Sequence, residues 1–352
     1  MALKFHQKSK LLLAKTQADE NTLATPAATD AIAIFDADFT TELSSETFQY
    51  TGSELDRDEG VTVKDKFATA TGDTFVPALS DIAAGTPASV ALFPLAKMFE
   101  AGGGAVTYGS GTGPTPGNNT DQKVTISNLT SVDKFLTVDM LEGTAADSTF
   151  QNQYRLGAVR ANVDLSIEVG SRAKLKWNFK GNTFDSYPGN EGLYPKVLTT
   201  PIAPNYGTQK TVIMPAIRKA NITLAEIQLL ETAFTGGTTK NISFSKLMAA
   251  NLFGFDYGRF LSADEEGFDK GAVATDVVLT VLTPKADATI VPEKMLEKFY
   301  HFQFAWGSVK GQRVQVIFNK LQVMNISNST VGNYKAKDIT FRNTGNVSIE
   351  LT

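Results

Sequence analysis

The chain contains no cysteine and only two histidines among its 352 residues. Without cysteine it can form no disulfide, thiol nucleophile or cysteine-ligated metal site, which suits a protein that folds in a reducing compartment. Neither histidine has the setting of a catalytic base, because His6 lies in a lysine-rich N-terminal segment and His301 lies in an alternating pattern with no marked nucleophile beside it. We therefore expect no catalytic residue, no cofactor and no metal ion.

Long apolar runs are also absent. None approaches the ~18–20 residues of a membrane-spanning helix, and Leu11–Ala14 is shorter than the apolar region of a signal peptide, about 7–15 residues. We expect the protein to stay in the cytoplasm where it is made. Its composition, 42% hydrophobic and 20% charged, is that of a folded protein.

Basic residues are not in excess. The chain has 33 lysines and arginines against 37 acidic residues, a net charge of −4. Proteins that grip nucleic acid do so largely through clustered Lys and Arg on phosphates. The balance of charge therefore argues against a nucleic-acid-binding function.

The clearest structural signal is a two-stranded hairpin between Gly157 and Gly181. Two segments alternate apolar and polar residues, and the turn Val169-Gly170-Ser171 keeps both apolar rows on one face. We predict a hairpin with one buried face and one polar, largely basic face. This register sets two pairs of opposite charge across the strands, each worth ~0.2–1 kcal/mol: Glu168 with Arg172 and Asp164 with Lys176.

A related pattern recurs near the C-terminus. The segment Trp177–Asn182 is matched by Ile339–Asn346, and each follows a short apolar helical sequence, Lys97–Glu100 in one case and Lys294–Glu297 in the other. Because the elements come in the same order, the sequence favours one sheet-plus-helix unit used twice. We therefore predict a mainly β protein with two similar modules in tandem and a short helix in each.

Composition along the chain suggests where the modules begin and end. Residues 1–30 drift from lysines into Thr, Ala and Pro and are expected to form an arm without a core of its own. The other predicted divisions are a first module over residues 31–190, a Pro-rich linker over 191–216 and a second module over 217–352.

Within the first module, alternation over Ile32–Tyr50 predicts a strand with Phe35, Ala37 and Phe39 on one face and Asp36, Asp38 and Glu42 on the other. A helix is expected over Val90–Ala101, with its first turn set by Pro94. Three loops are also expected: the charged segments Gly52–Lys66 and Ser262–Lys270, and the Gly- and Pro-rich segment Gly102–Asn119.

These features together resemble the tail tube proteins of long-tailed bacteriophages. The resemblance rests on the opening Gln7–Thr16, the loop Leu55–Asp58, the helix around Phe93–Phe99 and the hairpin that ends at Gly181. It covers nearly the whole chain as a pattern of spacings. The long Gly102–Asn119 segment departs from it, because the helix of this family usually meets a compact glycine turn.

The resemblance implies a β-sandwich or barrel-like tube fold and a structural, non-enzymatic role. Such proteins polymerise through their sheet edges into stacked rings, which form the hollow tail tube through which DNA passes into the host cell. The implied partners are further copies of the chain, tail initiator and terminator proteins, and a tape measure protein in the lumen. With two modules per chain, three chains would supply a pseudo-hexameric ring, and a true hexamer is the alternative. The implied location is the virion tail, assembled in the host cytoplasm.

A conduit needs an acidic or neutral lumen, since such a surface lets DNA slide without sticking. Asp36, Asp38 and Glu42 are therefore the candidate lumen residues, with a solvent- or neighbour-facing position as the alternative. Charged loops are the candidate contacts between subunits or between rings. These residues are Glu54, Asp56, Arg57, Asp58 and Glu59 in the first loop and Asp264, Glu265, Glu266 and Asp269 in the second.

Two other functions stay open. A tail terminator or a capsid decoration protein would form a single ring or isolated sites and no filament. A β-sandwich enzyme acting on carbohydrates would need two carboxylates across a cleft, and the sequence offers many carboxylates without placing any pair.

Overall fold

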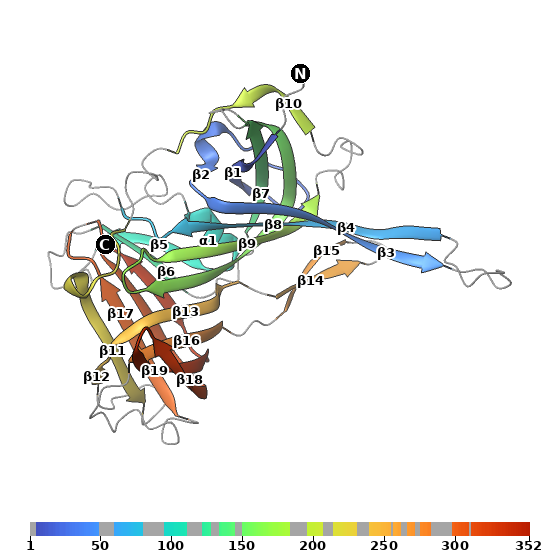
Figure 1. Ribbon diagram of the computed structural model, residues 1–352. Coiled ribbons are helices and arrows are strands. Elements are labelled where there is room, and N and C mark those ends of the chain that lie inside the picture. The colour runs from blue at the N-terminus through green and yellow to red at the C-terminus, as the bar shows by residue number, and fades with distance from the viewer. Residues whose placement is uncertain are drawn as a thin grey trace.

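The protein is mainly β. In a computed structural model, eighteen strands form one hydrogen-bonded sheet, a further two form a separate hairpin, and α1 is the one α-helix of the described residues (Figure 1). The structure describes residues 5–48, 60–79, 95–110, 122–127, 134–144, 150–183, 196–206, 214–230, 239–254, 256–261, 266–271, 275–282, 298–309 and 311–352.

The N-terminal part of the chain holds the elements up to β10, including a short 3-10 helix, η1. They are β1 (Phe5–Gln17), η1 (Ala28–Asp30), β2 (Ala31–Ile32), β3 (Phe35–Phe48), β4 (Gly60–Phe75), α1 (Ala96–Ala101), β5 (Ala105–Ser110), β6 (Gln122–Ser127), β7 (Phe135–Thr144), β8 (Phe150–Glu168), β9 (Lys174–Thr183) and β10 (Lys196–Ile202).

The C-terminal part holds the remaining elements and begins with a second 3-10 helix, η4. They are η4 (Lys219–Asn221), β11 (Ile222–Leu230), β12 (Thr239–Asn241), β13 (Phe244–Phe253), β14 (Asp256–Leu261), β15 (Glu266–Gly271), β16 (Thr275–Leu282), β17 (Phe299–Trp306), β18 (Val314–Val331), β19 (Tyr334–Asn343) and β20 (Val347–Leu351).

The two parts share one pattern of antiparallel pairing. In the N-terminal part β1 pairs with β2 and β7, β8 with β7, β9 and β10, and β4 with β3 and β9. In the C-terminal part β11 pairs with β12 and β17, β18 with β17, β19 and β20, and β16 with β13 and β19. Every pairing of the first set has its counterpart in the second, and the paired strands follow in the same order along the chain.

The predicted hairpin is confirmed as β8 and β9. Asp164 lies opposite Lys176 as expected, and the turn is closed by the Ser171 N–H, which donates to the Glu168 carbonyl at 3.0 Å. One face of the hairpin is completely buried and the other is polar, because the period-2 alternation matches the pleat. The buried residues are Val159, Ala161, Val163, Leu165, Ile167, Ala173, Leu175, Trp177 and Phe179.

Two strand pairings join the parts into one sheet. The C-terminal half of β8 pairs with β13, and β20 pairs with β6. The core is correspondingly continuous: Phe99 of α1 packs edge-on against Trp177 of β9 at 4.9 Å and against Phe253 of β13 at 5.6 Å. Among the described residues, the sheet and the core therefore continue from the first predicted module, 31–190, into the second, 217–352.

The expectation that residues 1–30 form an arm without a core is wrong for the part of this segment that forms β1. Their first strand, β1, pairs with β7, and Leu11–Ala14 are completely buried. Leu12 and Ala14 face the main core, whereas Leu11 and Leu13 face a second apolar cluster with Leu141 and Phe150. A strand buried on both faces reads as a plain apolar run, so it lacks the alternation that identifies half-buried strands.

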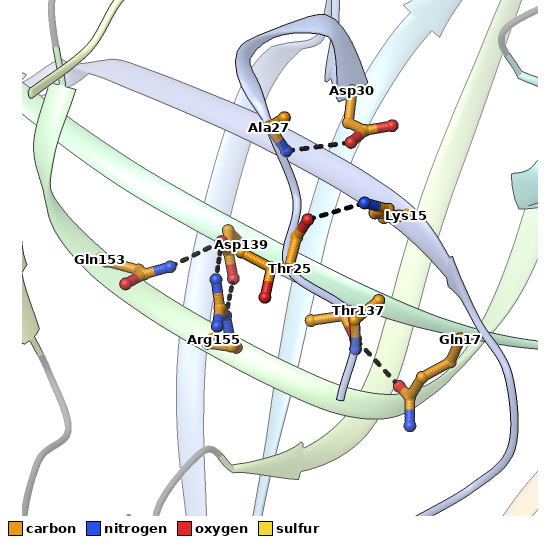
Figure 2. A network of polar contacts seen from close by, with 10 residues as sticks. Lys15, Gln17, Thr25, Ala27, Asp30, Thr137, Asp139, Gln153 and Arg155 are labelled. Atoms are coloured by element: carbon orange, nitrogen blue, oxygen red, sulfur yellow. Dashed lines mark hydrogen bonds and ion pairs between the residues drawn. The ribbon is translucent and has the colours of Figure 1, made fainter. Parts of the chain in front are cut away.

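Polar contacts hold the segment after β1 against the sheet (Figure 2). The Gln17 side chain is buried. Its oxygen accepts hydrogen bonds from the Ala158 N–H at 2.9 Å and the Thr137 hydroxyl at 3.1 Å. Its NH₂ group donates to the backbone carbonyls of Asp19 and Glu20. Ala158 has a φ of 50° at a bulge in β8, a strained conformation for a non-glycine residue. Gln17 therefore ties β1 to β7 and to this bulge.

Three predicted loops and the linker differ from the structure in the same way. Residues 60–66 of the first charged loop belong to β4, residues 105–110 of the glycine-rich segment form β5, residues 266–270 of the second charged loop belong to β15, and residues 196–202 of the linker form β10. Each is a strand because a hairpin partner or β8 supplies its hydrogen bonds, which composition does not reveal. Residues 52–59, 111–119 and 262–265 of these loops lie outside the described residues.

The predicted helix is shorter than expected. Within Val90–Ala101, α1 covers Ala96–Ala101, and residues 90–94 lie outside the described part of the chain. Pro94 precedes the helix, in keeping with the poor tolerance of proline for a helix interior. The counterpart expected at Lys294–Glu297 also lies outside the described residues.

Candidate assembly site

A single antiparallel ladder crosses both parts of the molecule. Its order is β3, β4, β9, β8, β13, β16, β19, β18. Within the described residues, β3 has β4 as its one strand partner, and residues 325–331 of β18 have β19 as theirs. The ladder therefore ends in two different open edges, which we call the β3 edge and the β18 edge.

The face of the ladder that points away from the core is polar and mixed in charge. Asp73 of β4, Lys176 of β9 and Asp164 of β8 lie directly opposite one another in adjacent strands. Farther along, the Arg342 side chain of β19 donates to Asp276 of β16 at 3.2 Å. At these positions positive groups alternate with negative ones, so their charges largely offset one another.

On the polar face, two lysines of β9 lie over phenylalanine rings of β3 and β4. The Lys174 ammonium lies 5.1 Å from the ring centre of Phe35, and the Lys180 ammonium lies 5.1 Å from that of Phe67. Such cation–π contacts are worth ~0.5–1 kcal/mol at exposed sites and hold the lysines flat along the sheet. The basic residues of the predicted hairpin thus share a face with Asp38, one of the candidate lumen residues.

The candidate lumen residues lie in β3 at the open edge. Asp36 and Asp38 are exposed, and Asp38 accepts a hydrogen bond from the Lys10 ammonium at 2.8 Å, which lowers the pKa of its carboxyl. Asp38 is opposite Thr71 and therefore points to the polar face. Of Glu42, the structure describes the backbone, which pairs with Phe67. Nothing in the described structure assigns these residues to a lumen.

One prediction for this strand is wrong. Phe35 lies opposite Asp73, and Asp38 lies opposite Thr71, so Phe35 shares the polar face with Asp38, whereas Phe39 lies on the core side. The cause is a bulge at Asp36, whose φ is 52°.

The pKa of the Asp73 carboxyl, on the neighbouring strand β4, is raised mainly by burial. The charge of Lys174 opposes this rise, and the negative charge of Asp36 adds to it.

Of the candidate loop residues, Glu266 and Asp269 lie in β15, in a strand and not in a loop. Asp269 pairs with Gly258 and Glu266 with Leu261 of β14, so both belong to the hairpin β14–β15. In the view of Figure 1 this hairpin and the long hairpin β3–β4 both extend to the right of the body. The other candidates, Glu54, Asp56, Arg57, Asp58, Glu59, Asp264 and Glu265, lie outside the described residues.

The sequence analysis did not identify the β18 edge. The segment Asn325–Val331 reads Asn-Ile-Ser-Asn-Ser-Thr-Val, and most of its side chains are exposed. Such a segment has no regular apolar alternation, so it avoids the exposed apolar edge strand that would be prone to aggregate. That polar run is the signal that could have located the edge.

Comparison with known proteins does not place the chain in a family. No protein-family model matches it, and no curated protein is detectably similar to it. Within the described residues no cluster of His, Asp and Glu side chains is arranged to hold a metal ion. In the same part of the chain, no helix has the length and apolarity needed to cross a bilayer.

Proposed function

We propose that the protein is a structural subunit that polymerises into stacked rings and forms a hollow tube for the passage of DNA. The observation that carries this proposal is the ladder from β3 to β18, which has one polar face and ends in two different edges. Different edges favour head-to-tail contacts between copies, and such contacts close into a ring when the rotation between copies allows it.

The polar face suits the inside of such a tube. DNA is dense in negative charge, so a strongly basic wall would retain it. On this face Lys176 lies between Asp73 and Asp164, and Arg342 pairs with Asp276, so these two cations are balanced by neighbouring carboxylates. A tube wall whose positive and negative charges balance would let DNA pass without binding it tightly.

Ring size follows from the recurring strand order. If the matched pairings reflect one unit used twice, each chain supplies two units, and three chains supply the six units of a pseudo-hexameric ring. A ring of six chains is the alternative. The hairpins β3–β4 and β14–β15 are candidates for contacts along the tube axis, since both project from the body (Figure 1).

Electron microscopy of the purified full chain at high concentration tests the proposal. Hollow filaments with a regular repeat are the expected result. The full chain is needed, because removing residues 1–30 would also remove β1 from the core. Closed single rings at every concentration would contradict the tube and favour a tail terminator or capsid decoration protein.

A hairpin deletion sharpens this test. The strands β14 and β15 pair only with each other among the described residues, so an Asn-Gly turn that joins Gly254 to Thr275 removes them without breaking the large sheet. We expect this variant to form rings that no longer stack, with the intact chain as the control. Filaments of unchanged repeat would exclude β14–β15 as an axial contact.

A further inference from the structure

The contact between β8 and β13 is an internal example of how one half of the ladder joins the next. Leu247 lies opposite Ile167, Met248 opposite Ser166 and Ala249 opposite Leu165. All of these except Met248 and Ser166 are buried, so the junction has an apolar side toward the core and a polar side toward the open face.

Backbone and side-chain contacts extend this junction at both ends. The Val169 N–H in the β8–β9 turn donates to the Ser245 carbonyl at 2.9 Å. At the other end the Asn251 N–H donates to the Asp164 carboxylate at 2.8 Å. Gly254 follows with a φ of +146°, and any Cβ there would overlap the side chain of Asn162. The junction is therefore a packed interface and not a chance contact of two strands.

The matched pairings identify the counterparts of these two strands. Trp177 of β9 corresponds to Ile339 of β19 in the shared pattern; Trp177 lies opposite Val163 of β8, and Ile339 lies opposite Ile326 of β18. Counting along both strands, Leu165, Ser166 and Ile167 of β8 correspond to Asn328, Ser329 and Thr330 of β18. The strand that matches β8 at the junction is thus the segment that forms the β18 edge.

The same reasoning matches β13 with β3. Trp177 lies opposite Gly72 of β4, and Ile339 lies opposite Leu279 of β16. The preceding residues are Thr71, which pairs with Asp38 of β3, and Val278, which pairs with Met248 of β13. Asp38 is therefore the counterpart of Met248. In the junction Met248 faces Ser166, and the counterpart of Ser166 is Ser329.

The geometry points to a contact between copies in which the β18 edge of one chain pairs with the β3 edge of the next, antiparallel, with Ser329 opposite Asp38 of the second copy. The same register sets Asn328 opposite Phe39 and Thr330 opposite Ala37. This contact repeats the β8–β13 junction, so the ladder continues from chain to chain around a ring. It rests on the proposed function and specifies the partner strands and the register that the tube would use.

Exposure of the two edges agrees with this pairing. Asn328 and Thr330 are exposed, although their counterparts Leu165 and Ile167 are buried within the junction. Phe39 and Ala37 are partly exposed on the facing edge. Pairing would cover these four side chains with small or apolar neighbours, next to the ion pair that Asp38 makes with Lys10 of β1.

Paired cysteines test the register directly, because the native chain has no cysteine. We would purify Asp38→Cys/Ser329→Cys, oxidise it at a concentration that supports assembly, and separate the products under non-reducing denaturing conditions. Residues directly opposite in antiparallel strands have Cβ atoms ~4.5–5.5 Å apart, so a short bis-thiol reagent serves as a second cross-linker if a direct disulfide is strained. Controls are both single variants and Asn21→Cys/Ser329→Cys, in which Asn21 is exposed and belongs to neither edge strand.

The double variant is expected to give a ladder of covalent oligomers that stops at the ring size, while every control stays at the monomer. Dimers from the Ser329→Cys variant alone would show a two-fold edge contact and overturn the proposal. Hollow filaments without Asp38–Ser329 cross-links would also overturn it while leaving the tube intact. Cross-linked rings that never stack would support the register and contradict the tube.

Discussion

Asp139 shows how a single charged residue is accommodated inside this sheet. Its side chain is completely buried on β7 and accepts hydrogen bonds from Arg155 at 2.6 and 2.7 Å and from Gln153 at 2.6 Å (Figure 2). Burial raises the pKa of the Asp139 carboxyl, and the bonds from Arg155 oppose that rise. The pair thus depends on its bidentate geometry, since a buried charge is tolerated only when it is fully paired.

Replacing Asp139 with asparagine should destabilise the protein by about 3–5 kcal/mol, because it leaves the largely buried Arg155 without its counter-charge. Urea unfolding monitored by circular dichroism measures this. Asp276→Asn is the matched control: its pair with Arg342 is 46% exposed on both sides, so the loss should stay below ~1 kcal/mol. Equal losses in the two variants would contradict the structural role assigned to Asp139.

At the scale of elements, the sequence predicted those strands that have one solvent-exposed face and one buried face. The β8–β9 hairpin follows from alternation and turn length alone, and its register is confirmed at Asp164 and Lys176. The same logic failed for β1, because Leu11–Ala14 are buried on both sides, and for Phe35, because a bulge moved it to the other face. The alternation of apolar and polar residues does not show whether a strand is covered on both faces, as β1 is. It also does not show where a bulge adds a residue, as in β3.

The candidate site was predictable only in part for a related reason. Asp36 and Asp38 were selected as polar residues of a strand, and the structure places both on β3. Their neighbours on the polar face, Lys174 and Lys176, come from a strand more than a hundred residues later, and the junction of β8 with β13 joins residues about 80–90 positions apart. Such long-range pairing depends on the tertiary fold, so one sequence without a structure does not reveal it.

The open edges allow an element-scale prediction that separates assembly from folding. Asn328→Lys/Thr330→Lys places two ammonium groups at exposed positions of β18, so the monomer should keep its stability within about 0.5 kcal/mol. In the proposed contact the same groups would be covered, and assembly should weaken at least tenfold. Sedimentation velocity over a concentration series measures the change, with Asn21→Lys as the control for added charge. Unchanged assembly would exclude the β18 edge from the interface.

The whole molecule is expected to unfold as one unit, although its strand order repeats. The halves share the β8–β13 and β20–β6 pairings and a core in which Phe99 touches Phe253. Separating them would expose buried apolar residues such as Leu165, Ile167 and Leu247. Exposing a fully buried Leu or Ile side chain costs ~1.5–3 kcal/mol, so the exposure of several of them is comparable with the ~5–15 kcal/mol by which domains are usually stable.

The two tryptophans provide a probe in each half. Trp177 and Trp306 are both completely buried; Trp177 donates to the Thr74 hydroxyl at 2.8 Å in the N-terminal half, while Trp306 lies in β17. In Trp306→Phe the fluorescence reports on the first half, and in Trp177→Phe on the second, while circular dichroism reports on the whole sheet. For each variant, measured as a monomer, the two signals should give the same urea midpoint. If the urea midpoint from fluorescence differed from that from circular dichroism in either variant, the halves would fold independently. The β8–β13 junction would then be too weak to serve as the template for a contact between chains.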